Sequence, residues 1–237
     1  MTIEEFFQKM LGIPTPNTAV NTTPTTLESI TRVDTTPIPA PVANVVHVAP
    51  PITTSGLKLT PQLIEDIITP YVSNANKANI EALVPYLNEY LPQYGINDLL
   101  RVSHFLGQAA EESADFMTLK EYASGSEYED RRDLGNIYPG DGPRYKGRGI
   151  FQLTGRANYE SVGKALGLDL VNHPELAETP EVAVRTACEY WKSRNLQVYA
   201  DRDDIRSMTL HINGGYNGLT TRTTFTNKAK VVLKVLF

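Results

Sequence analysis

The chain has little cysteine, no strong charge of either sign and no long apolar run, and each absence excludes a class of protein. Cys188 is the single cysteine among 237 residues, so no internal disulfide can form and the chain suits a reducing cytoplasm. The formal charge of −5 gives no strong attraction to nucleic acid. No run approaches the roughly 18 apolar residues that a membrane-spanning helix needs. We therefore expect neither a nucleic-acid partner nor membrane insertion.

The first residues also lack the basic region and the long apolar core of a signal peptide. We expect a chain made in the host cytoplasm, which something else must carry to any target outside the membrane. Histidine is scarce as well. The four histidines are scattered singly, without the spacing of a metal-ligand set. We accordingly expect no metal and no cofactor, and we expect Cys188 to be a small packing residue inside a helix.

Composition divides the chain into three parts. Residues 1–12 have apolar side chains at helical spacing and predict a short helical segment that would be marginal alone. Residues 13–56 contain 8 of the 16 prolines and 11 threonines, which predicts an extended linker or docking arm. Its valines favour docking on a partner over a free spacer. Residues 57–237 have the helical periodicity of a globular domain.

Within 57–237 the periodic segments predict a mainly α fold. Thr60 and Pro61 signal the start of the first helix. Pro85 marks a kink or a fresh start in the apolar pattern that follows, and Asn97 or Asp98 caps a helix through about Asp115. Further helices are predicted near 155–166, 180–194, 201–211 and 219–236. The segment 116–154 is rich in glycine, tyrosine and charge, and predicts loops with short strands at most, which form a substrate cleft.

One carboxylate interrupts the apolar stripe of the helix at 98–115. At about 100° per residue, Glu112 falls within roughly 20° of Phe105, on the face that turns to the core, whereas Glu111 points away and is expected to be solvated. Burial and the negative end of the helix dipole both disfavour ionisation of Glu112, which suits a general acid. Glu121 can face the same cleft if the helix ends between the two residues. Paired carboxylates are the minimal equipment of a glycosidase, although most acidic clusters are solvated surfaces.

A second group of polar residues lies in the loop at 140–159. Gln152, Thr154 and Asn158 alternate with apolar Phe151 and Leu153, and neutral amides and hydroxyls suit sugar hydroxyls, N-acetyl groups or a positioned water. The glycines lack the context of a phosphate-binding loop. The alternative is an ordinary hairpin whose arginines pair with the acids at 111–130. A further glycine-rich turn at 211–218 allows close approach of the backbone to a ligand.

These motifs, in this order, resemble the glycoside hydrolases of family 19, which include chitinases and phage endolysins with a lysozyme-like helical fold. The likeness covers about residues 57–237 and is greatest to the phage endolysin branch, whose domains show a stretch similar to 135–142. The segments that carry it are 105–113, Glu121, 145–154, 158–159 and 212–215.

The resemblance implies a role for each matching residue. Glu112 resembles the general acid, Glu121 the glutamate that positions or activates the attacking water, and Thr154 the hydroxyl that holds this water. The remaining matches contact the sugar or support the acid: Gln152, Asn158, Tyr145, Asn213 and Arg222. The family inverts the anomeric configuration, which predicts a wide gap between the carboxylates. One position departs from the family pattern, because Glu111 stands where a histidine usually precedes the acid.

The expected function is therefore hydrolysis of β-1,4 bonds in the glycan strands of bacterial peptidoglycan. Residues 1–56 predict a protein partner, and we expect a phage lysin docked on a larger particle that acts on the cell wall as a virion component. Two alternatives stay open at this point: a chitinase, and a catalytically weak structural or binding protein of the virion.

Overall fold

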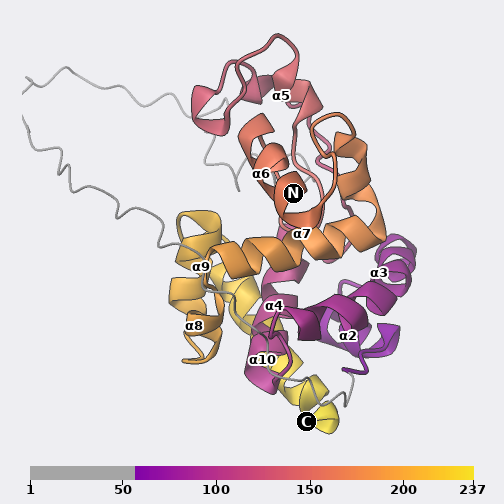
Figure 1. Ribbon diagram of the computed structural model, residues 1–237. Helices are drawn as coiled ribbons and strands as arrows, with labels where there is room; N and C mark the ends of the chain where they lie inside the picture. Colours follow the sequence, from indigo (N-terminus) through magenta and orange to yellow (C-terminus); the bar gives the residue numbers. More distant parts are fainter. Residues whose placement is uncertain (1–56) are drawn as a thin grey trace, which may run out of the picture. The chain divides into compact units, whose positions relative to one another are not determined.

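Helices make up the regular structure of residues 57–237, the part of the chain that the computed structural model describes (Figure 1). The predicted segments 1–12 and 13–56 lie outside the described residues. The helices are α2 (Pro61–Ile68), α3 (Asn74–Gln93), α4 (Leu99–Glu112), α5 (Asp141–Arg144), α6 (Arg156–Leu166), α7 (Pro180–Ser193), α8 (Gln197–Ala200), α9 (Ile205–Asn213) and α10 (Leu219–Val232). Short 3₁₀ turns are η1 (Ser126–Tyr128), η2 (Arg132–Leu134), η3 (Pro174–Glu178) and η4 (Leu233–Leu236). The prediction of a mainly α, lysozyme-like fold is confirmed.

Side-chain caps set the starts of the first helices. Thr60 accepts a hydrogen bond from the Leu63 amide, and Asp98 accepts one from the Arg101 amide at 2.9 Å. These two caps agree with the sequence pattern. The alternative of a fresh start at Pro85 is wrong, because α3 runs continuously through it. Apolar residues on both sides of Pro85 are buried against the same core, and this packing holds the helix together despite the missing amide donor.

Two predicted boundaries were wrong by a few residues. The helix that carries the acidic residues ends at Glu112 instead of about Asp115, because Ala114, Asp115 and Phe116 all take left-handed backbone angles. The helix expected at 201–211 begins at Ile205, where Asp204 caps it. The segment 116–154 forms short helical turns, with antiparallel bridges from Lys120 to Arg148 and from Arg148 to Leu153 in place of strands.

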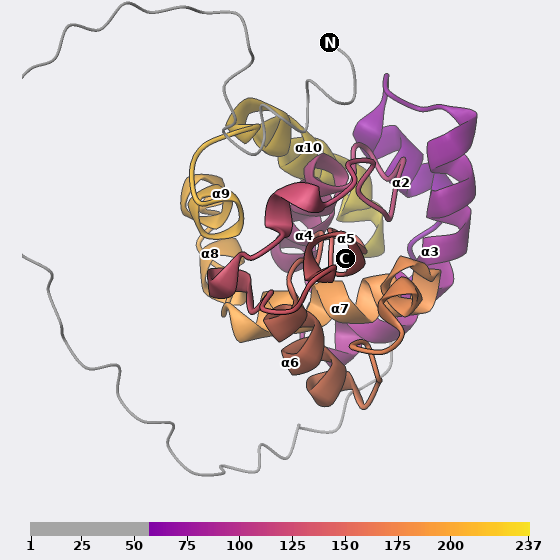
Figure 2. The ribbon, with the colours of Figure 1, turned by 90° about the horizontal axis from the view of Figure 1, so that it is seen from above.

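Helix α4 is the centre of the larger of two hydrophobic cores. Every residue from Val102 to Glu112 is buried, and Figure 2 shows the other long helices arranged around this one. Its most extensive neighbour is α10. The two backbones approach closely at Gly107, where an added Cβ would lie 2.8 Å from the amide nitrogen of Thr226. Cys188 is fully buried in the same core, as predicted, and burial raises the pKa of its thiol.

A smaller core lies in the part of the domain that α5 and α6 form, on the far side of α7 from α2 and α10 (Figure 1). Its buried members are Tyr145, Tyr159, Leu170, Ala177 and Val182. The loop at 144–154, which carries several of the predicted site residues, is anchored on this core. In the described range, no helix has both the length and the apolar content to cross a bilayer.

Because the two backbones approach closely at Gly107, a methyl group added at this residue is predicted to destabilise the fold. Gly107→Ala forces the added carbon against the backbone of Thr226, so α4 and α10 must separate. We expect the free energy of unfolding to fall by about 1–3 kcal/mol, as for other overpacked cores, although alanine has the higher helix propensity. Urea denaturation monitored by far-UV circular dichroism measures this change. An unchanged or increased midpoint would show that the helices are not held at this distance.

Candidate active site

Glu112 is the last residue of α4, and its carboxylate is buried against an arginine. Only 7% of Glu112 is exposed, and its Oε1 accepts a hydrogen bond from Nη2 of Arg222 at 2.6 Å. Arg222 lies on the first turn and a half of α10 and has no exposed surface. Its other donors reach Gln108 Oε1 at 2.7 Å and the carbonyl of Asn217 at 3.2 Å. Arg222, which the resemblance assigns to support of the acid, thus contacts Glu112 directly.

Glu111 is not solvated, which corrects the prediction from helical spacing. The side chain is 8% exposed and lies against Gly218, the residue that precedes α10. Burial raises the pKa of its carboxyl to about 7, and the charges of Glu112 and Asp115 act in the same direction, whereas Arg222 and the Thr221 side chain oppose them. The prediction failed because the face of α4 that carries Glu111 is covered by α10, which is more than a hundred residues later in the sequence.

The chain leaves the helix in a turn directly after Glu112. The Ser113 hydroxyl bonds to the carbonyl of Ala109 at 2.6 Å and accepts from the amide of Phe116, which closes the end of α4. Asp115, in this turn, is partly buried, and burial raises the pKa of its carboxyl to about 6. The helix thus ends between Glu112 and Glu121, which is the condition for both carboxylates to face one cleft.

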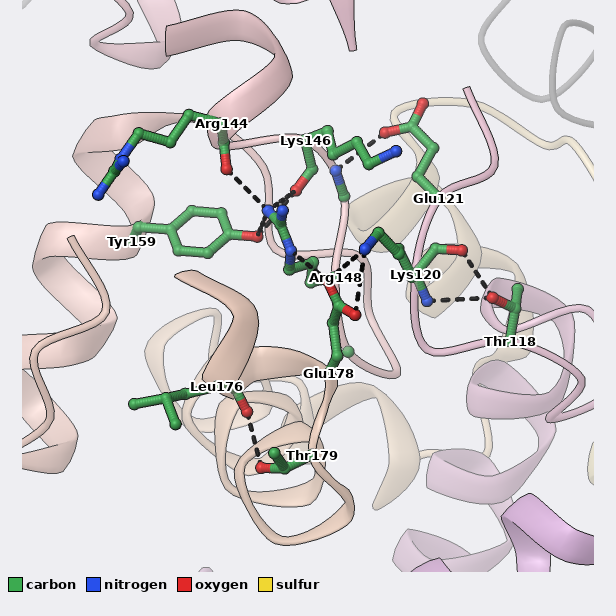
Figure 3. Close-up of polar contacts among 12 residues, drawn as sticks. Thr118, Lys120, Glu121, Arg144, Lys146, Arg148, Tyr159, Leu176, Glu178 and Thr179 are labelled. Carbon is green, nitrogen blue, oxygen red and sulfur yellow. Dashed lines mark hydrogen bonds and ion pairs between the residues drawn. The ribbon is translucent and has the colours of Figure 1, made fainter. Parts of the chain in front are cut away.

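Glu121 is 4% exposed and is held by two donors of different kinds. The amide of Gly147 donates to Oε2 at 2.9 Å (Figure 3), and the hydroxyl of Tyr128 donates to Oε1 at 3.0 Å. Burial raises the pKa of Glu121, while both hydrogen bonds lower it by stabilising the carboxylate. The backbone is fixed as well, since the Glu121 amide donates to the carbonyl of Gly147. Glu121 is therefore positioned by the loop and not by a helix.

Arg148 organises the loop that holds Glu121. Figure 3 shows its guanidinium at the centre of a set of oxygens from neighbouring segments. It donates to Glu178 at 2.7 Å, to the Tyr159 hydroxyl at 3.0 Å and to the carbonyl of Arg144 at 2.8 Å. The alternative in which the arginines of this loop pair with acids at 111–130 is wrong for Arg148, and also for Arg156, which pairs with Asp141 at 2.6 Å.

Two of the predicted polar residues, Gln152 and Thr154, lie in this loop, and a third, Asn158, lies at the start of α6. Gln152 has a left-handed backbone (φ 46°) and donates from Nε2 to the carbonyl of Gly149. Gln152 Oε1 lies beside Gly147. A Cβ added to this glycine would be 2.6 Å from Gln152 Oε1 and 3.1 Å from Glu121 Oε2. The amide oxygen of Gln152 and the carboxylate of Glu121 thus both lie against Gly147. Thr154 donates to the carbonyl of Gln152, and exposed Asn158 donates to that of Thr154.

Tyr145 is buried in a core, whereas Asn213 has a side-chain oxygen without a hydrogen-bond partner. Tyr145 is completely buried in the smaller core, and its hydroxyl donates to the carbonyl of Val171 at 2.9 Å. With no exposed surface it supports the loop and cannot touch a sugar, which corrects its assignment to substrate binding. Asn213 ends α9, and its Oδ1 is buried without a hydrogen-bond partner. This acceptor is free for a donor that the described residues do not supply.

Sequence reasoning missed two members of the site. Tyr128, the phenol that holds Glu121, lies in η1, and nothing in its local sequence distinguishes it from neighbouring tyrosines. Gln108 precedes Glu112 by one helical turn and orients Arg222; its i, i+4 spacing on the face of Glu112 was the available signal. Among the described residues, no group of three or more acidic, histidine or cysteine side chains has the arrangement of a metal site.

A surface groove of about 790 Å³ runs along α6 and the segment 167–171. Tyr138 and Arg156 line it, with the arginine over the tyrosine ring at 4.8 Å. Neither Glu112 nor Glu121 contributes to its lining. This groove is therefore not the site of the two carboxylates.

Comparison with known proteins relates part of the chain to one enzyme family. Residues 103–203, which include both carboxylates, match the family model of class I chitinases, glycoside hydrolase family 19. A family 19 domain-containing protein of Haemophilus influenzae is 36% identical over 114 residues, which are 46% of this chain and 55% of the relative. Chitinase 11 of Oryza sativa subsp. japonica is 52% identical over 59 residues, 24% of this chain and 23% of the relative. The matches thus span about half, or less, of these relatives.

Solved structures extend the likeness to the fold. Chitinase C from Streptomyces griseus superimposes with a TM-score of 0.57 and 23% identity, over 78% of this chain and 95% of that chain. The class IV chitinase of Zea mays gives the same TM-score at 18% identity, over 75% and 92%. Sequence match and fold point the same way: residues 103–203, with Glu112 and Glu121 among them, are similar to glycoside hydrolase family 19, and the described domain has the fold of its chitinases.

Proposed function

We propose that the domain hydrolyses β-1,4 glycosidic bonds of an amino-sugar polymer by an inverting general acid/base mechanism. The observation that carries the proposal is the contrast between its two buried carboxylates. Glu112 lies at a helix C-terminus in an ion pair with a guanidinium, whereas Glu121 lies in a loop and accepts hydrogen bonds from an uncharged amide and a phenol. Two carboxyl groups in different surroundings can divide the roles of acid and base between them.

In this mechanism Glu112 protonates the oxygen of the leaving sugar. Glu121 accepts a proton from the water that attacks the opposite face of the ring. Gln152 Oε1 lies against Gly147, as Glu121 does, and is suited to accept a hydrogen bond from the same water. The Thr154 hydroxyl donates to a backbone carbonyl, so its oxygen can also accept a hydrogen bond from this water. Asn158 and the unpartnered oxygen of Asn213 offer contacts to sugar hydroxyls or N-acetyl groups.

We propose bacterial peptidoglycan as the polymer, on the sequence resemblance to the phage endolysin branch. Chitin is the second candidate, and it is favoured by the names of the relatives and of the solved structures. Both polymers contain β-1,4-linked N-acetylglucosamine, so the machinery described above serves either one. The difference lies in the lactyl-peptide substituent of alternate sugars in peptidoglycan, which requires space beside the bound strand.

We also propose that residues 1–56 attach the enzyme to a phage particle. The proposal rests on composition alone, since a proline- and threonine-rich arm that contains valine suits an extended segment laid along a partner. In this arrangement the particle carries the hydrolase to the cell wall.

Glu112→Gln tests the catalytic role. The substitution keeps the shape and the contact with Arg222 but removes the transferable proton, so we expect turnover to fall by about 10²–10⁴-fold. Full-length protein is incubated with purified peptidoglycan and, in parallel, with chitin oligomers, and products are identified by mass spectrometry. The reducing-end sugar of the products names the bond. Glu81→Gln, on the exposed face of α3, is the matched control. Undiminished turnover by Glu112→Gln would contradict the proposed mechanism.

Tyr128→Phe tests the role of Glu121 as base. Loss of the phenol removes a hydrogen bond that lowers the pKa of Glu121. Because a base must be ionised, the acidic limb of the pH–rate profile should move to higher pH, by about one unit for a hydrogen bond to a charged group. Tyr71→Phe, in the exposed connection between α2 and α3, should leave the profile unchanged. A shift of the alkaline limb instead would mean that Glu121 acts as the acid.

Deletion of residues 1–56 separates attachment from catalysis. The truncated chain should retain hydrolysis of soluble glycan fragments while its association with phage particles, followed by sedimentation and immunoblotting, is lost. Association at the level of the full chain would refute the docking role of this arm.

A further inference from the structure

Two exposed arginines, Arg194 and Arg206, each lie over a tyrosine ring, and their guanidinium groups have no carboxylate partner among the described residues. The guanidinium carbon of Arg194, the residue that follows α7, is 4.5 Å from the centre of the Tyr190 ring. That of Arg206, in the first turn of α9, is 3.9 Å from the centre of the Tyr216 ring. Stacking on a ring holds a guanidinium in place while the N–H donors at its edge stay available. Both arginines can therefore receive an anion without giving up an ion pair.

Tyr190, which carries Arg194, belongs to the surroundings of the candidate acid. The end of α7 lies beside α9 (Figure 1), and the Tyr190 hydroxyl donates to the carbonyl of Ile212 at 3.3 Å. Burial raises the pKa of this hydroxyl to about 12; the charges of Arg194 and Arg222 lower it, and that of Glu112 raises it. The Tyr190 ring is thus within electrostatic reach of Arg194 on one side and of the buried ion pair on the other.

Tyr216, which carries Arg206, lies in the turn between α9 and α10. Asn213, three residues earlier, has the unpartnered oxygen that is proposed to contact the substrate. Asn217, the next residue, accepts a hydrogen bond at its carbonyl from Arg222, which holds Glu112. Tyr216 itself is 44% exposed. Arg206 is therefore anchored at the surface of the same turn that supports the candidate acid from below.

The two candidate polymers differ in what they offer to these cations. Chitin consists of neutral N-acetylglucosamine and carries no group that requires a positive charge. In peptidoglycan, alternate sugars carry a lactyl group, which ends in a carboxylate or continues into a peptide that has carboxylates of its own. Guanidinium binds a carboxylate through two parallel N–H donors. The charge of this part of the domain is thus complementary to peptidoglycan and has no counterpart in chitin.

We propose that Arg194 and Arg206 bind carboxylates on the substituents of alternate sugars and thereby select peptidoglycan over chitin. The inference rests on the proposed function, because it requires a glycan strand bound beside Glu112. Cleavage stays with the two buried carboxylates, while the arginines determine which strand is held. Tyr190 and Tyr216 are positioning residues, since each fixes one guanidinium beside the site.

Charge removal at each arginine tests the selection. Full-length Arg194→Gln, Arg206→Gln and the double variant are assayed on soluble peptidoglycan strands that keep their peptides, on strands from which an amidase has removed the peptides, and on chitin oligomers. We expect KM for the carboxylate-bearing strands to rise by about 2–5-fold for each substitution, as for exposed charge pairs, and further in the double variant. The kcat values, and KM for chitin oligomers, should change little. Arg202→Gln, which removes an exposed arginine from the turn after α8, is the matched control.

The three substrates separate the possible outcomes. A rise in KM that persists after the peptides are removed identifies the lactyl carboxylate as the ligand, whereas a rise confined to strands with peptides identifies the peptide carboxylates. An equal rise on chitin oligomers would mean a general contact with sugar and would overturn the proposal. An unchanged KM on every substrate, or an equal loss of kcat on all of them, would overturn it as well.

A binding measurement keeps this test separate from that of the proposed function. Dissociation constants are measured by isothermal titration calorimetry for Glu112→Gln, with and without the two arginine substitutions, at low and high salt. Binding of carboxylate-bearing strands should weaken with salt when both arginines are present, and this dependence should largely disappear in their absence. Binding of chitin oligomers should be the same in both proteins. If the salt dependence survives the loss of both arginines, the selection is refuted, whether or not the domain cleaves any of these strands.

Discussion

The ion pair between Arg222 and Glu112 is the constraint on which the described domain depends. Arg222 has no exposed surface, and two of its three hydrogen bonds cross from α10 to Gln108 and Glu112 of α4. Breaking a buried pair by removing one partner costs about 3–5 kcal/mol, because the other charge is left without compensation. The two helices must therefore cross at one distance and in one register. Gly107 permits this distance, since any larger residue would meet the backbone of Thr226. The same contact that stabilises the core thus places the candidate acid.

Glu121 is positioned by loops and not by the packing of two helices. Its carboxylate is fixed by a backbone amide and a phenol within the loops that rest on the smaller core. Arg148, which is itself buried, ties these loops to η3 through Glu178, so the position of Glu121 depends on hydrogen bonds between loops and not on helix packing. The two carboxylates therefore belong to different packing units of one domain.

The sequence predicted those features that local patterns determine. Caps at Thr60 and Asp98 marked helix starts, and the apolar stripe of α4 placed Glu112 against the core. It failed where a distant segment decides the outcome. Glu111 looked solvated because its cover, α10, is remote in sequence, and Tyr145 looked accessible because the core that buries it is assembled from 159, 170 and 182. Tyr128 could not be found at all, since one phenol among many meets Glu121 only after the loops have folded.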